Sequence, residues 1–226
     1  MSRFDDFNRM FDVNSPVMVF LAKVADLIIL SALWFFCSLP VITIGPATAA
    51  LYYVALKIVR KEEIRVVPTF FKGFRMNFKQ GIVINLIFLV LGVIIAADYF
   101  IMSHVDEGAM SDVILACFFV MGVWLLCISY WAYPLQAQFV NPIRKTLRNA
   151  MLLSTQKFAI TVGLFLIHMI PLAVVIADTS LKAFILAAPL WILLAPGVFA
   201  YLASRMLVKV FDPLIKPAES EVPEEV

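Results

Sequence analysis

Two ionisable residues, Lys23 and Asp26, interrupt an apolar stretch near the amino end of this 226-residue chain. They are three residues apart, so on a helix they share a face and can pair. On a helix that begins at Val17, Asp26 would lie roughly 14 Å along the axis, near the middle of a hydrocarbon layer about 30 Å thick, whereas Lys23 could reach the membrane boundary. A carboxylate at this depth indicates a proton or substrate site, but a structural ion pair inside a bundle explains it equally well.

A third polar residue, His168, lies near the centre of the apolar segment 158–177. Its imidazole could serve a proton relay. The sequence places no acidic residue within a helical turn of it, which favours a neutral histidine that donates one hydrogen bond to a neighbouring helix. Lys23, Asp26 and His168 together form the candidate intramembrane polar site.

A candidate broken helix occupies residues 38–46, which read Ser-Leu-Pro-Val-Ile-Thr-Ile-Gly-Pro. In transporters, such breaks bind ligands because unwound backbone exposes carbonyl groups and helix amino ends attract anions. The alternative is a tight structural corner in which hydroxyl groups satisfy the freed backbone. The residues of the motif are Ser38, Pro40, Thr43, Gly45 and Pro46.

An amphipathic helix is predicted between residues 68 and 81. On a helical wheel its four phenylalanines fill an arc of about 100° and its three bases fill the adjacent arc. We expect an interfacial helix whose aromatic face sinks into the membrane and whose bases meet anionic headgroups or an acidic protein partner. The residues concerned are Phe70, Phe71, Phe74, Phe78, Lys72, Arg75 and Lys79.

Motifs for enzymatic chemistry are missing from the sequence. The chain has two histidines and no HExxH pair, GxSxG elbow or Walker loop. We therefore expect no enzyme, no catalytic residue, no cofactor and no metal. The basic loops are short and close to the membrane, so we expect them to meet membrane lipid and not nucleic acid.

The elements that must position these residues are apolar helices. Hydrophobic residues make up 63% of the chain and charged residues 15%, which exceeds what one soluble core can hide from water. A spanning helix needs about 20 mostly apolar residues. We expect one all-α transmembrane domain over residues 1–210, with six spans (five if segment 41–60 does not cross), and an acidic, flexible tail over 211–226. The spans are predicted at 17–39, 41–60, 81–102, 113–139, 158–177 and 183–207.

The cations predict the orientation of these spans. All but one of the eighteen Lys and Arg fall at the two ends or in alternate loops. Because cytoplasmic loops carry an excess of Lys and Arg, this pattern predicts a multi-pass protein of the cytoplasmic membrane with both termini in the cytoplasm.

The sequence from 33 to 54, Leu-Trp-Phe-Phe-Cys-Ser-Leu-Pro-Val-Ile-Thr-Ile-Gly-Pro-Ala-Thr-Ala-Ala-Leu-Tyr-Tyr-Val, resembles the YesL-like family of bacterial membrane proteins. The run from 74 to 81, Phe-Arg-Met-Asn-Phe-Lys-Gln-Gly, is similar to the same family. The family is a domain of unknown function, and the resemblance implies an association with carbohydrate uptake and degradation, without a mechanism.

Two functions fit the sequence. The first is a non-enzymatic accessory component of carbohydrate uptake that acts by binding transporter subunits. The alternative is a small transporter or channel with a site near the broken helix and Asp26. A water-accessible cavity that reaches Asp26 would favour the transporter, and a solid bundle with a lateral apolar groove would favour partner binding.

Overall fold

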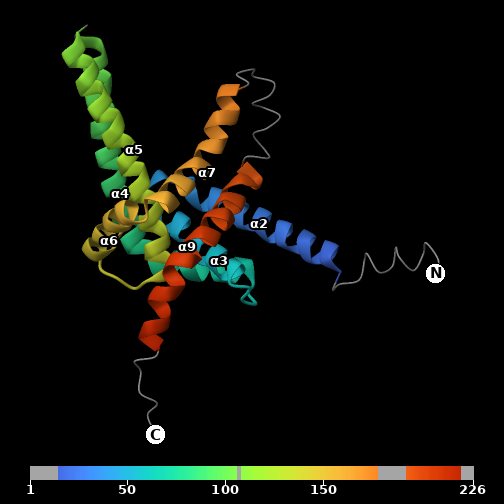
Figure 1. Ribbon diagram of the computed structural model, residues 1–226. Coiled ribbons are helices and arrows are strands. Elements are labelled where there is room, and N and C mark those ends of the chain that lie inside the picture. Colours follow the sequence, from blue (N-terminus) through green and yellow to red (C-terminus); the bar gives the residue numbers. More distant parts are fainter. Residues whose placement is uncertain (1–14, 106–107, 178–191, 220–226) are drawn as a thin grey trace.

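A computed structural model describes residues 15–105, 108–177 and 192–219, and these residues form helices and connecting turns with no strand. The elements in chain order are α2 (Pro16–Ser38), the 3₁₀ turn η1 (Val41–Thr43), α3 (Ile44–Val59), α4 (Val66–Val105), α5 (Ala109–Gln138), α6 (Ile143–Gln156), α7 (Phe158–Ala177) and α9 (Ala195–Glu219). The predicted all-helical class is confirmed (Figure 1).

Among the described residues, four helices are long and apolar enough to cross a membrane: Val17–Ser38, Val41–Val59, Val66–His104 and Met110–Gln138. A bent pair, Ile143–Gln156 with Phe158–Ile170, makes a fifth if it counts as one span. These helices indicate a membrane protein, while the predicted number of six spans is not confirmed.

The carboxyl-terminal helix differs from its prediction. Residues 183–191 of the predicted span 183–207 lie outside the described residues, and residues 195–207 belong to α9. This helix runs on to Glu219, past the expected start of a tail at 211. Arg205, Lys209 and Asp212 alternate with its apolar residues, and α9 is not among the candidate spans. Helix continues here because Phe211 is fully buried against the bundle.

The segment whose crossing was doubtful, α3, is the centre of the bundle. In the candidate span Val41–Val59, which contains α3, 56% of the apolar window is buried, against 17% in Val17–Ser38. Helix α3 contacts α2, α4, α5 and α9. Ala47, Ala49, Ala50 and Ala55 are fully buried, because small side chains let neighbouring backbones approach closely. The irregular backbone that precedes this helix, the turn η1, packs against α2 and α4.

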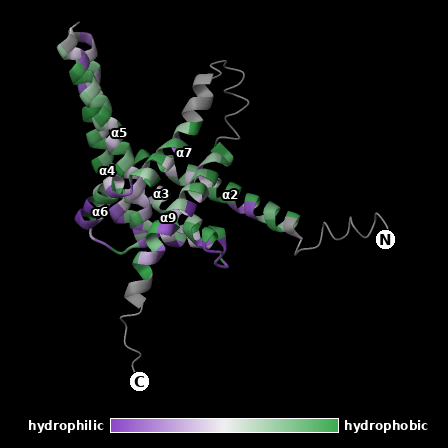
Figure 2. Cartoon of the chain, in the orientation of Figure 1, coloured by the Kyte–Doolittle hydropathy of each residue, from purple (hydrophilic) through white to green (hydrophobic). Residues whose placement is uncertain are grey.

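Helices α4 and α5 form a hairpin that runs away from the other helices (Figure 1). At 1.5 Å per residue, the 40 residues of α4 extend about 60 Å, roughly twice the hydrocarbon thickness of a bilayer. Most residues in the outer part of the hairpin are hydrophobic (Figure 2). Among them, Phe100, Phe119 and Val120 are all more than 60% exposed. This surface suits contact with lipid.

Helices α6 and α7 follow each other with a bend of 98° at Lys157. One face of α6, formed by Thr146, Ala150 and Ser154, is buried. The Thr161 hydroxyl of α7 donates a hydrogen bond to the Ser154 carbonyl of α6 at 2.9 Å. The bend is therefore held by side chains on both of its sides.

Candidate functional site

The broken-helix motif is a packed corner. The Thr43 hydroxyl, which has one proton to donate, lies 2.7 Å from the Cys37 carbonyl and 2.8 Å from the Pro40 carbonyl. The Pro40 carbonyl also accepts from the Thr43 backbone N–H at 2.9 Å, so Thr43 caps the carbonyl end of α2. The Asn85 amide of α4 donates to the Val41 carbonyl at 2.9 Å. The Ser38 hydroxyl is buried and makes no hydrogen bond among the described residues. Thr43 thus has the capping role that the structural-corner interpretation gives it, while Asn85 takes the place expected of Ser38.

Two glycines, Gly45 of α3 and Gly81 of α4, explain the tightness of this corner. A Cβ atom on Gly45 would collide with the backbone oxygen of Gly81, and one on Gly81 would lie 2.7 Å from the nitrogen of Pro46. The helix backbones of α3 and α4 are therefore in direct contact, as at other small-residue crossings in membranes. The residues Ser38, Pro40, Thr43, Gly45 and Pro46 line none of four cavities found in the described part of the chain.

Lys23 and Asp26 are placed on the outer part of α2, away from the core. Lys23 is exposed and Asp26 is partly exposed. The two side chains form no ion pair with each other, since the ion pairs of the described residues are Lys57–Glu62 and Arg60–Asp212. Neither residue lines any of the four cavities. The functional role proposed for them remains a prediction.

His168 is partly buried and contacts α3 and α5. Its Nδ1 is 2.7 Å from the Leu164 carbonyl of its own helix, and an acceptor at that position requires the proton on Nδ1. Nε2 is then the acceptor for the Tyr52 hydroxyl of α3, at 3.4 Å. The predicted bond to a neighbouring helix exists, but His168 accepts it instead of donating it. The Tyr130 ring stacks on the imidazole with centroids 4.3 Å apart.

A cavity of about 340 Å³ opens beside His168 between α2, α3, α5 and α9. Five of its twelve lining residues are Phe, Tyr or Trp, and none is an acid, Lys or Arg: Trp34, Thr48, Leu51, Tyr52, Ser129, Tyr130, Tyr133, His168, Ala195, Pro196, Phe199 and Ala200. A second, wide groove of about 720 Å³ runs between the lipid-facing halves of α4 and α5 and is almost entirely apolar. Another cavity, of about 350 Å³, lies beside α6, between Lys145 and Leu214.

The predicted interfacial helix is the first part of α4 and is continuous with the span that follows it. This corrects the expectation of a separate helix lying in the membrane plane. Phe70 is fully buried in the protein core, while Phe71 and Phe78 are 41% and 39% exposed. The aromatic face is split because its Phe70 edge packs against α3 and only the remainder faces outward. Lys72, Arg75 and Lys79 are all exposed, as predicted.

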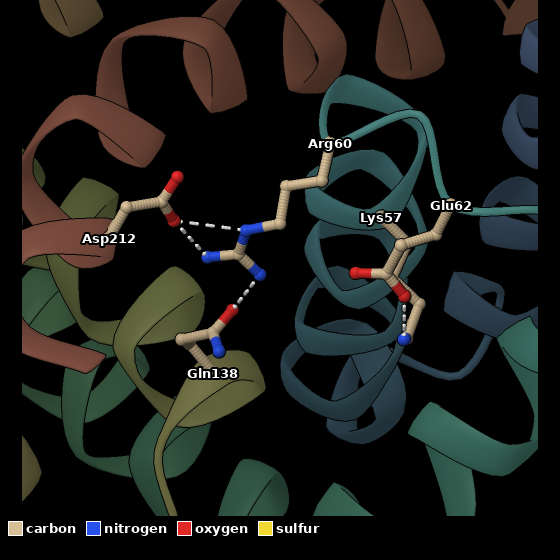
Figure 3. Close-up of polar contacts among 5 residues, drawn as sticks. All are labelled: Lys57, Arg60, Glu62, Gln138 and Asp212. Carbon is tan, nitrogen blue, oxygen red and sulfur yellow. Dashed lines mark hydrogen bonds and ion pairs between the residues drawn. The ribbon is translucent and has the colours of Figure 1, made fainter. Parts of the chain in front are cut away.

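A polar cluster around Arg60 joins three helices. Arg60, at the end of α3, donates two hydrogen bonds to Asp212 of α9, at 3.0 Å from Nε and 2.8 Å from Nη2 (Figure 3). Its Nη1 donates to the Gln138 side chain at the end of α5, at 2.8 Å. The sequence predicts only that Arg60 faces the cytoplasm. It carries no signal for this contact, because Asp212 is 152 residues away.

Replacing Asp212 with asparagine should lower the free energy of unfolding by about 1 kcal/mol, because the pair is partly exposed and Arg60 keeps Gln138. The measurement is thermal unfolding of the purified protein in detergent. Glu62→Gln is the control, since it makes the same change in the Lys57–Glu62 pair, which is local to one turn and joins no helices. Equal losses in the two variants would contradict a special role for Arg60.

Metal binding finds no support in the described residues, where no three His, Cys, Asp or Glu side chains group together. The prediction of no metal and no cofactor stays a prediction.

Comparisons with known proteins give one match. No curated protein and no solved structure matches the chain. Residues 27–99, less than half of the chain, match a family model described as a protein of unknown function, DUF624, and this region contains the corner, α3 and most of α4.

Proposed function

We propose that this chain is a non-enzymatic, multi-pass protein of the cytoplasmic membrane that assists carbohydrate uptake by binding transporter subunits at its cytoplasmic face. The distribution of Lys and Arg supports cytoplasmic termini. The resemblance of residues 33–54 and 74–81 to the YesL-like family supports carbohydrate uptake as the process.

The observation that carries this proposal is the outward face of α6. This face combines bases with exposed apolar side chains, of which Met151 and Leu152 are 45% and 46% exposed. Its exposed bases are Arg144, Lys145 and Arg148. Because α6 and α7 meet at 98°, a membrane-crossing α7 leaves α6 lying along the membrane surface. The buried face of α6 fixes it to the bundle, so the outward face is free for a partner.

The partner that fits this face is a soluble transporter subunit with an acidic, partly apolar surface. Opposite charges steer the encounter and fix its register, and the apolar side chains supply burial. A cytoplasmic ATPase subunit of a carbohydrate transporter has the location that the proposal requires.

Purification in mild detergent should recover carbohydrate permease or ATPase subunits with the wild-type protein. The double variant Arg144→Glu and Arg148→Glu should reduce this recovery at least tenfold, because like charges at an interface cost several kcal/mol. The matched control reverses two exposed bases of α9, Arg205→Glu and Lys209→Glu. A photo-crosslinking residue at position 151 should capture the same subunit.

Recovery of the protein alone under several detergent conditions would overturn the proposal. Movement of a sugar or proton by the reconstituted protein, lost in Asp26→Asn, would instead support the small transporter. The four cavities of the described residues give that alternative no opening at Asp26.

A further inference from the structure

A groove of about 760 Å³ lies between the first part of α4 and the end of α5. We propose that this α4–α5 groove binds one anionic phospholipid whose headgroup is an uncharged alcohol. The phosphate lies at Arg75 and Lys79, and the first part of an acyl chain lies against Phe78 and Phe139, which line the groove nearest the apolar segments. The groove is separate from the outward face of α6, and the inference is independent of the proposed partner.

The rim of the groove is basic and suits an anionic ligand. Arg75 and Lys79 line it, both are exposed, and neither is in an ion pair of the described residues. None of the residues that line the groove is acidic. Two cations one turn apart on a helix repel each other weakly unless an anion lies between them, and a phosphate diester has the charge and the acceptor oxygens to do so.

The walls of the groove are aromatic and suit an apolar part of a ligand. Phe71, Phe74, Phe78 and Phe139 line it, and the Phe74 and Phe78 rings lie 5.4 Å apart. At its α5 end, Val140 is 99% exposed. A patch of this kind beside bases is typical of a surface that takes an amphipathic ligand.

The floor of the groove contains a side-chain oxygen that accepts no hydrogen bond in the described part of the chain. Gln136 lines the groove and is only 4% exposed. Its amide nitrogen donates to the Asn77 carbonyl at 3.1 Å, while its Oε1 is buried and accepts no hydrogen bond in the described part of the chain. A buried acceptor without a donor costs about 1–3 kcal/mol, so a ligand hydroxyl at this position would be favoured.

The level of the groove distinguishes a lipid from a soluble ligand. The apolar run of α4 begins at Gly81, two residues after Lys79, and α5 ends at Gln138, next to Phe139. The groove therefore lies where the two apolar helices leave the hydrocarbon layer, at the depth of the lipid phosphates. Basic pockets between spanning helices at this depth bind anionic headgroups.

The bases of the rim and the Gln136 oxygen of the floor together favour one type of lipid headgroup. An ammonium headgroup could donate to Gln136, but Arg75 and Lys79 would repel it. A glycerol headgroup supplies the hydroxyl donors with no added positive charge. Phosphatidylglycerol therefore fits the groove better than phosphatidylethanolamine or phosphatidylcholine.

The test titrates the purified full-length protein with phosphatidylglycerol and counts bound lipid by native mass spectrometry. Lys79→Gln and Arg75→Gln should each weaken binding about fivefold, the effect of losing one base near anionic lipid. Lys72→Gln is the matched control, because Lys72 is an exposed base on the same helix that does not line the groove. It should change binding less than twofold.

Three further ligands complete the test. Phosphatidylcholine should bind more weakly than phosphatidylglycerol, and so should phosphatidylmethanol, which has the same charge and no headgroup hydroxyl. Soluble glycerol phosphate should bind much more weakly, since it lacks the acyl chains. Equal binding of any of these, an equal loss in Lys72→Gln, or a protein segment crosslinked in the groove of the native complex would overturn the proposal.

Discussion

Replacing Gly81 with alanine is expected to lower the free energy of unfolding by about 3 kcal/mol, the upper end of the usual cost of overpacking. The added Cβ would lie 2.7, 2.8 and 2.9 Å from the nitrogen, Cα and Cδ of Pro46. None of these atoms belongs to a side chain that can rotate away. Relief therefore requires α3 and α4 to separate, which also strains the hydrogen bond from Asn85 to the Val41 carbonyl.

The control for this prediction is Gly92→Ala on the same helix. Outside its chain neighbours and the local helix backbone, no atom lies within 4 Å of the position that its Cβ would take, so no clash is expected. Alanine also favours helix by up to about 1 kcal/mol over glycine. Thermal unfolding in detergent, followed by helical circular dichroism, should show Gly81→Ala well below wild type and Gly92→Ala at or above it. Wild-type stability of Gly81→Ala would mean that α3 and α4 do not cross at this point.

The contact between Gly81 and Pro46 could not be predicted from the sequence, although the break in the helix could. Pro40, Gly45 and Pro46 indicate a break locally, because each restricts or frees its own backbone, and the break is present as expected. The sequence does not say which glycine of the chain packs against Pro46. That choice depends on how the surfaces of two whole helices fit, and alanines and glycines are spread through the apolar segments.

The sequence also does not show which polar residues of different helices meet. The hydropathy of α2, α4 and α5 predicts these helices well, because length and apolarity act along one segment. Asn85, Gln136 and Arg60 depend instead on partners from other helices. Asn85 could be expected to join helices, and it does, since it also accepts from Tyr133 at 3.2 Å. Its second partner, the Val41 carbonyl, belongs to a turn whose geometry hydropathy does not encode.

The prediction for the aromatic face of α4 was wrong because this face lies partly in the protein core and partly on the outside of the bundle. The Phe70–Phe78 face was expected to enter the membrane as a unit. In the structure its Phe70 edge is core and its Phe71 and Phe78 positions are exposed, because α4 packs on α3 only along one side. An amphipathic pattern gives the apolar arc but not which part of it meets protein and which meets lipid.

Truncating Trp131 to alanine is expected to lower the free energy of unfolding by about 3–5 kcal/mol, the cost of removing a large buried aromatic side chain. Trp131 is fully buried and meets the edge of the Phe211 ring, with centroids 6.4 Å apart. Its Nε1 donates to the Thr161 hydroxyl at 2.9 Å, and that hydroxyl in turn donates to Ser154. One side chain therefore connects α5 to α9 and to both sides of the α6–α7 bend.

Two companion variants separate packing from hydrogen bonding at this position. Trp124→Ala, on the same helix but 42% exposed, should cost far less, because its ring fills no core space. Trp131→Phe keeps most of the volume and removes the donor, so about 1 kcal/mol of the loss should remain. Unfolding in detergent measures all three, and a crosslinking residue at position 151 reports whether α6 stays in place. If Trp131→Ala were as mild as Trp124→Ala, the contacts of Trp131 with Phe211 and Thr161 would not stabilise the bundle, and the bend that presents α6 to a partner would need another support.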